Sequence, residues 1–531
     1  MSPRPGFVLE VDGSTPPILF HHGEGFRLER LPPGRSRVIY PKEPLEGIAD
    51  PVAAIRAALA NPIGADPLAT QLRPGMKLTI AFDDISLPLP PMQAPDIRSM
   101  VLEAVLDCAA AAGVDDVEII AALALHRRMT EDELRHAVGD RVYDAFAPSG
   151  KLYNHDAEDP DGMVTLGTTP HGEAVRMNRR AAESDLVVYV NINLVSMDGG
   201  WKSTATGLSD YQSLRHHHNV NTMRHSTSFM DQHRSELHSS NWRMGRVIRQ
   251  AGPKIFQIET TVNTNVFGTS GPLAVLQKRE WEWSWRDRTT FAALQAGLKP
   301  MPPAARRQFF HSWRAPYELT SVQCGDVEAV HERTTEKVYE QHIVPVQGQT
   351  DILTMGLPYL CPYNVNSIMN PILVMCSGLG YFFNFYRGMP LVRKGGVLIM
   401  SHPCRREFHP VHHPSYIDFF DEVLADTTDP VEIEARYEKQ YAEDEWYRHL
   451  YRTSYAYHGV HPFYMWYWGS HALEHLGRVI VVGGHPSSVR RLGFMPATTL
   501  DDALEMASDV VGRDATITHL HNPPIFMADV T

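Results

Sequence analysis

The strongest constraint on the fold is an alternation of apolar strands and helices that begins near residue 76. MKLTIAFDD (76–84) alternates as a strand does and ends in two acidic residues. DIRSMVLEAVLDCAAAAG (96–113) has helical periodicity with a glycine stop, and VEIIAALALH (117–126) is a second apolar run. We therefore predict a strand, a crossover helix and a second, parallel strand.

The same alternation continues along the chain. A capping box from Thr130 to Glu133 predicts a helix that ends at Gly139. Further buried strands are predicted at DLVVYVNIN (185–193), GGVLIMSH (395–402) and RVIVVGG (478–484). Strands that alternate with helices are typical of an α/β fold with mostly parallel sheets, and this is the fold class we predict.

The length of 531 residues is enough for more than one hydrophobic core. We predict two α/β domains with mostly parallel sheets. The first covers residues 1–265 and binds the cofactor, and a final helix and strand in 495–531 return to it. The second covers residues 266–494, and we expect the active site in the interdomain cleft.

Composition restricts the class of partner. A formal net charge of -13 argues against nucleic acid or an anionic membrane, because phosphate recognition needs a concentrated positive field. The five cysteines are scattered and suit neither a disulfide framework nor a metal knuckle. The N-terminus lacks the apolar core of a signal peptide. We therefore expect a cytoplasmic protein with a small-molecule substrate.

Polar residues follow three of the predicted strands. Asp83 and Asp84 follow the first, His126 the second, and the turn DGGWK, which ends at Lys202, the third. Ligands of open parallel sheets bind beyond the carboxyl ends of strands, so neighbouring strands would bring these groups to one edge. Taken singly, the acidic pair could cap a helix, His126 could lie in an exposed loop, and Gly-Gly-x-Lys lacks P-loop spacing.

Two histidine clusters are candidates for metal binding. His216, His217 and His218 are consecutive, whereas paired ligands on a helix normally lie four residues apart, so a solvated run is the alternative. SHPCRREFHPVHHP (401–414) could hold zinc, although its prolines favour an irregular loop.

Taken in order, these segments resemble the lactate racemase family, which uses a nickel-pincer nucleotide. DDISLP (83–88) stands where the family has Asp-x-Thr-Arg-Pro. The other matching segments are LALHRR (123–128), YNHDAED (153–159) and GGWK (199–202). The resemblance covers roughly residues 75–220.

The resemblance implies a cofactor site. Lys202 would tether the nucleotide through a thioamide, and His218, sixteen positions further on, would bind nickel, with His216 and His217 as local alternatives. Gly199 and Gly200 would let the nucleotide approach the backbone. Asp84 and Ser86 would bind the nucleotide or orient its neighbours, and His126 would be the general base for the substrate hydroxyl.

The sequence departs from the family at two positions. The arginine that clamps the substrate carboxylate is replaced by Leu87, so lactate is not the expected substrate. The second catalytic histidine is replaced by Ile192, so either one base serves both directions or another histidine acts, with candidates His155, His171 and His217. In the second half, the substrate contacts implied by the resemblance are Arg387 and Trp468.

The predicted activity is that of a racemase or epimerase acting on a larger 2-hydroxy acid or a sugar. Inversion would proceed by hydride transfer to and from the nickel-pincer nucleotide. The expected partners are the substrate and the enzymes of cofactor biosynthesis, with a homo-oligomer possible. The alternatives are an oxidoreductase with the same cofactor, a non-catalytic cofactor-binding homologue, and a zinc hydrolase built on residues 402–413.

Overall fold

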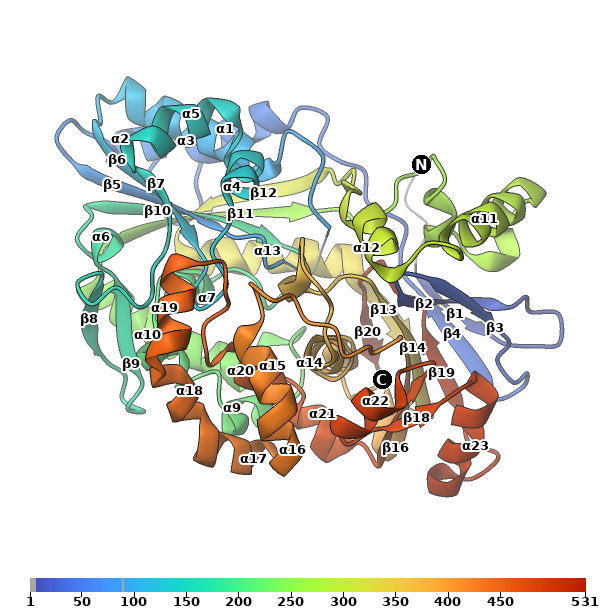
Figure 1. Ribbon diagram of the computed structural model, residues 1–531. Helices are drawn as coiled ribbons and strands as arrows, with labels where there is room; N and C mark the ends of the chain where they lie inside the picture. The colour runs from blue at the N-terminus through green and yellow to red at the C-terminus, as the bar shows by residue number, and fades with distance from the viewer. Residues whose placement is uncertain (1–5, 88–89) are drawn as a thin grey trace.

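Two β-sheets organise the molecule, and helices cover them (Figure 1). The computed structural model describes residues 6–87 and 90–531. Within each sheet most neighbouring strands run parallel. The predicted α/β class with mostly parallel sheets is therefore confirmed.

The first sheet has six strands in the order β12-β11-β10-β5-β6-β7. Their bounds are β5 Lys77–Asp83, β6 Asp116–Ala122, β7 Leu152–Asn154, β10 Leu186–Asn193, β11 Lys254–Val262 and β12 Leu319–Gly325. Only β12 runs antiparallel to its neighbour. The three strands with polar ends, β5, β6 and β10, are adjacent, as the shared-edge prediction requires.

Local sequence signals determine the helices around this sheet. Asp96 caps α3 (Ile97–Ala111), which connects β5 to β6. Thr130 and Glu133 form the predicted capping box of α4 (Glu131–Val138), which ends at Gly139. On the other side of the sheet, α13 (Val327–His342) packs along β11 and β12 (Figure 1).

The second sheet has nine strands, seven of them in the order β1-β4-β19-β14-β16-β17-β18. Their bounds are β1 Phe7–Glu10, β4 Ser36–Tyr40, β14 Thr350–Pro358, β16 Val392–Ser401, β17 Arg478–Val482, β18 Met495–Ala497 and β19 Ile517–Leu520. β2 (Ile18–Gly23) pairs with β14 and with β3 (Phe26–Glu29).

The sheets do not follow the predicted domain boundaries. β1 and β4 lie in the second sheet although they precede the first, and β12 lies in the first sheet although it follows residue 265. The final helix α23 (Leu500–Val511) and β19 exist as predicted, but β19 pairs with β14 and β4 of the second sheet. Residues 495–531 thus return to a strand within residues 1–265, β4, but this strand belongs to the second sheet, because sheet partners depend on long-range pairing that local sequence does not encode.

No helix in the described part of the chain combines the length and apolar character that crossing a membrane requires.

Candidate active site

The polar ends of β5, β6 and β10 line one pocket. Among the residues around it are Asp84, Ser86, Leu87, His126, Gly199 and Lys202. Neighbouring parallel strands end at one edge, which is why residues more than a hundred positions apart meet there. The predicted grouping of carboxylate, imidazole and amine is confirmed. Pro88 of the same motif lies outside the described residues.

A buried carboxylate orients His126. Asp84 Oδ2 lies 3.0 Å from His126 Nδ1, and Ser86 donates to Asp84 through both its backbone N–H and its hydroxyl. Burial opposes ionisation of Asp84, but His126 and the bonds from Ser86 outweigh it and hold the pKa of Asp84 below its ordinary value. An ionised Asp84 accepts the Nδ1 proton of His126, so Nε2 is left as the nitrogen that faces a substrate.

The adjacent Asp83 has a different role. Its Oδ2 accepts hydrogen bonds from Asn191 Nδ2 at 2.6 Å and from the Ile192 backbone N–H at 2.9 Å. Burial raises the pKa of Asp83 to about 7. Asp83 thus links β5 to β10. Ile192 stands where the family has its second catalytic histidine, and its side chain is buried in the hydrophobic core, so it cannot act in place of that histidine.

Lys202 lies in α7 (Trp201–Gly207), directly after the glycine turn. Its Nζ is 3.5 Å from Asp198 Oδ1, and the other carboxylate oxygen of Asp198 accepts the backbone N–H groups of Leu194 and Val195. The Lys202 side chain remains 23% exposed. The amine is therefore positioned at the pocket and accessible from it.

The glycine turn is held by a buried carboxylate that the sequence analysis missed. Glu259 accepts the Gly200 N–H at 2.6 Å, and it lies 3.1 Å from His331 Nδ1 and 3.2 Å from Asn193 Nδ2. Gly199 and Gly200 both have positive φ, of 87° and 58°. A glutamate in the middle of an apolar strand, β11, was the available signal.

Substitution at Gly199 should destabilise the protein. A Cβ there would lie 2.3 Å from Asn193 Nδ2 and 2.4 Å from Glu259 Oε1. We expect Gly199→Ala to lose about 1–2 kcal/mol for the left-handed backbone and about 1–3 kcal/mol more for crowding. Gly512→Ala is the matched control, because its φ is 88° and no atom lies within 4 Å of its Cβ position. Thermal unfolding measures the effect, and equal shifts of the unfolding midpoint in Gly199→Ala and Gly512→Ala would contradict the crowding argument.

His218 is buried and is not among the residues that line the pocket of Lys202 and His126. Its Nδ1 lies 2.8 Å from His217 Nδ1, which leaves Nε2 available. Burial holds the pKa of His218 well below its ordinary value, with smaller contributions from His217, Lys202 and His126. His218 is thus a neutral imidazole within electrostatic range of Lys202 and His126. Its ring centroid is 5.7 Å from that of Trp468, whose role as a substrate contact stays a prediction.

Three of the predicted residues lie elsewhere. His155 is buried, with Nε2 2.9 Å from the Ser209 carbonyl and Nδ1 3.1 Å from Asn178 Nδ2, so both ring nitrogens are engaged. His171 lies exposed in the turn between β8 (Met163–Thr168) and β9 (Ala174–Asn178). Arg387 is exposed, with its guanidinium over the Tyr339 ring. The positions of these residues in the sequence did not predict where their side chains point.

The 402–413 cluster is also structural. No group of three metal-binding side chains was found in residues 6–87 and 90–531. His402 and His409 accept backbone N–H groups of their own loop, and His412 bonds the Ser367 hydroxyl. The zinc alternative therefore has no cluster of ligands among these residues.

A histidine from the second half of the chain approaches His126. His461 begins α20 (His461–Tyr467), and its ring centroid is 5.4 Å from that of His126. The Tyr416 hydroxyl lies 2.6 Å from His461 Nδ1, whereas His461 Nε2 is buried without a hydrogen-bond partner. The sequence analysis missed this residue, because no local motif marks it.

The preceding residues clamp this segment to the loop that carries His126. The Tyr451 hydroxyl donates to the Ala124 carbonyl at 2.8 Å, and the His458 N–H donates to the Leu125 carbonyl at 3.2 Å. α19 (Glu445–Thr453) accordingly lies against the lower edge of the first sheet in Figure 1. His126 and His461 are thus held in register by bonds between the two halves of the chain.

Part of the chain is similar in sequence to lactate racemases. Residues 22–231 match the model of the lactate racemase N-terminal domain. The lactate racemase of Lactiplantibacillus plantarum is 26% identical over 173 residues, which are 31% of this chain and 37% of the relative. That of Thermoanaerobacterium thermosaccharolyticum is 24% identical over 210 residues, 35% of this chain and 46% of the relative. The chain thus matches less than half the length of these curated relatives.

Two solved structures share the fold over nearly the whole chain. The lactate racemase apoprotein from Thermoanaerobacterium thermosaccharolyticum has a TM-score of 0.61 at 17% identity, covering 96% of this chain and 99% of that one. A Thermotoga maritima protein has a TM-score of 0.51 at 13% identity, covering 92% and 100%. At these identities the likeness establishes the fold.

Proposed function

We propose that the chain is a divergent member of the lactate racemase family, and that it is a racemase or epimerase that inverts a hydroxyl-bearing carbon. The substrate is a 2-hydroxy acid larger than lactate or a sugar, and the cofactor is a nickel-pincer nucleotide. The observation that carries the proposal is the pocket shared by Lys202, His126 and Asp84, with His218 in electrostatic range.

The residues of the pocket suit this cofactor. Lys202 offers an accessible amine for a covalent tether, and the free Nε2 of the neutral His218 suits nickel, which accepts imidazole nitrogen. Gly199 and Gly200 present no side chain where the nucleotide would meet the backbone. When bound, the nucleotide supplies a reversible acceptor for hydride from the substrate carbon.

The protein itself handles the hydroxyl proton. His126 Nε2 takes this proton from one stereoisomer, while Asp84 stabilises the charged ring through Nδ1. We propose His461 Nε2 for the other stereoisomer, because it is unpartnered and the Tyr416 hydroxyl fixes the ring at Nδ1. His461 thereby replaces the histidine lost at Ile192.

In this proposal Arg314 holds the substrate carboxylate in place of the family arginine that Leu87 replaces. Leu87 and Arg314 line the same neighbouring pocket. Arg314 donates to the carbonyls of His311 and Trp313, and it has no ion pair among the residues that the structure describes. It therefore carries an uncompensated charge on the side where the family arginine is missing. In this arrangement the two sheets are the cores of two domains and the substrate binds between them.

The test is production of the protein with and without the cofactor-biosynthesis enzymes. Intact mass should rise by the mass of the nucleotide only when those enzymes are present. Chiral chromatography should then show one stereoisomer of a 2-hydroxy acid approaching a mixture without accumulation of the keto compound. Accumulating keto product would indicate an oxidoreductase, and loading without turnover of any acid or sugar would indicate a non-catalytic homologue.

A further inference from the structure

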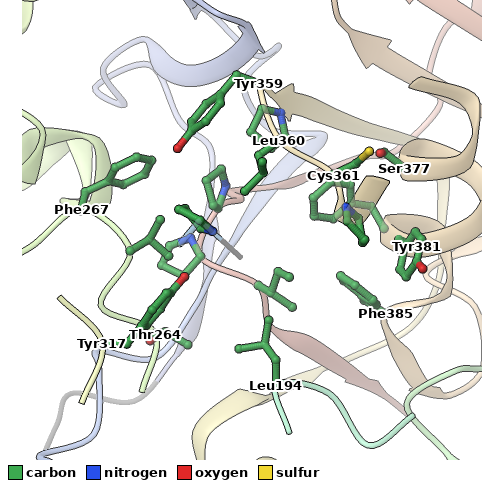
Figure 2. A pocket seen from close by; sticks show the side chains of 18 residues that line it. Leu194, Thr264, Phe267, Tyr317, Tyr359, Leu360, Cys361, Ser377, Tyr381 and Phe385 are labelled. Atoms are coloured by element: carbon green, nitrogen blue, oxygen red, sulfur yellow. The ribbon is translucent and has the colours of Figure 1, made fainter. Parts of the chain in front are cut away.

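An apolar pocket lies between the two sheets, next to the candidate active site (Figure 2). Leu194 follows β10, Val266 follows β11, Tyr359 follows β14, and Ile525 follows β19. The pocket is thus lined by segments that follow the carboxyl ends of parallel strands from both sheets, where ligands of such sheets bind. Figure 2 shows Leu194, Phe385 and Tyr381 on one side and Phe267 and Tyr317 on the other.

The residues that line the pocket favour binding of an apolar group. No charged side chain occurs among the described residues around the pocket. Thr264, Tyr359 and Ser377 each contribute a buried hydroxyl without a hydrogen-bond partner. A polyhydroxylated ligand would lose water at several groups and regain few hydrogen bonds, at a cost of about 1–3 kcal/mol for each unpaired group. Apolar surface instead gains about 25 cal/mol per Å² on burial.

Tyr381 separates this pocket from the reacting groups. Its hydroxyl is 2.8 Å from that of Tyr363, whose ring centroid lies 5.4 Å from that of His126. Its ring stacks on Trp468 at 5.7 Å, and Trp468 in turn adjoins His218. One aromatic layer therefore stands between the apolar pocket and the two histidines.

The pocket also adjoins the tether. Leu194 lines it with its side chain, while its backbone N–H donates to Asp198 Oδ2 at 3.3 Å. Asp198 is the carboxylate paired with Lys202. Among the described residues the two pockets share no lining residue, so a substrate side chain would enter the apolar pocket past Leu194 or by displacing the Tyr381 ring.

We propose that this pocket receives the side chain of the substrate, which makes the preferred substrate a 2-hydroxy acid with a branched alkyl side chain. The inference rests on the proposed function and names the substrate class of the same site. The cavity volume of about 50 Å³ has room for roughly four water molecules, which matches a branched alkyl group and is too small for an aromatic ring.

The first test compares substrates on the cofactor-loaded protein. Lactate, 2-hydroxy-4-methylpentanoate, 3-phenyllactate and gluconate differ in the group that would enter the pocket. We expect kcat/KM for 2-hydroxy-4-methylpentanoate to exceed that for the other three acids by at least about tenfold, because burial of even one methylene group is worth that factor. Equal or higher kcat/KM for any of these three acids would overturn the proposal.

The second test fills the pocket. Val266→Phe should lower kcat/KM for 2-hydroxy-4-methylpentanoate by about tenfold or more and leave the value for lactate within about threefold, because lactate has no group to place there. Thermal unfolding checks that the variant is folded. Leu194→Phe fills the opposite side and serves if Val266→Phe does not fold. A uniform loss for both acids in a folded variant would contradict the pocket assignment.

A third measurement separates this inference from the proposed function. Calorimetry on the protein without cofactor gives the Kd of each acid and needs no turnover. Tighter binding of 2-hydroxy-4-methylpentanoate than of the other acids without any inversion would sustain the pocket and reject the racemase. Inversion with no preference for the branched alkyl side chain would sustain the racemase and reject the pocket. Absence of both inversion and preference would reject both.

Discussion

Lys202→Arg is expected to abolish covalent loading of the protein and to reduce turnover by more than about 10³-fold, because the cofactor carries the difficult chemistry. Arginine keeps the positive charge that lies 3.5 Å from Asp198, so the local ion pair survives. A guanidinium cannot take the place of the amine in a thioamide. The intact mass of the variant should therefore be the same with and without the biosynthesis enzymes.

The matched control is Lys254→Arg, at the exposed start of β11. This variant should gain the same mass as the unsubstituted protein and keep its activity. An added mass that persists on Lys202→Arg would show that the tether is elsewhere, whatever the activity of the variant.

His126→Ala is expected to lower kcat by about 10²–10⁴-fold, the usual contribution of a general base, while the added mass of the cofactor is unchanged. The reason is geometric. Asp84 holds Nδ1 at 3.0 Å, and no other imidazole in the described residues has this carboxylate partner. Stopped-flow or chiral assays in both directions measure the effect, and intact mass verifies loading.

His461→Ala is the companion variant, and His225→Ala, at an exposed histidine, is the control. If His126 and His461 serve opposite stereoisomers, His461→Ala should also lower kcat by about 10²-fold or more, because either substitution removes one of the two proton acceptors. A rate for His126→Ala equal to that of His225→Ala would remove His126 from the mechanism. Full activity of loaded His461→Ala would instead indicate a single base that serves both directions.

Much of the site was predictable because its parts are local. A strand that ends in Asp83 and Asp84, a strand followed by His126, and a glycine turn before Lys202 each leave a pattern in contiguous residues. Parallel strands place such ends together, so the grouping followed once β5, β6 and β10 were taken as neighbours. The roles of Lys202, His218 and His126 in chemistry remain predictions.

The misses share one physical cause. His461 reaches His126 only because Tyr451 and His458 bond the loop before it, and Glu259 supports the glycine turn across β10 and β11. His155 and His171 lie near a motif in sequence, yet their side chains are committed to other contacts or to solvent. The separation of two residues along the chain does not predict where their side chains point.

The sequence by itself determined the α/β alternation, the capped helices and the polar strand ends, since periodicity and capping act over a few residues. Only the tertiary structure decided that β1, β4 and β19 join the second sheet, that His461 faces His126, and that an apolar pocket adjoins the site. Strand partners and pocket walls come from segments hundreds of residues apart, and their choice depends on the packing of the whole chain.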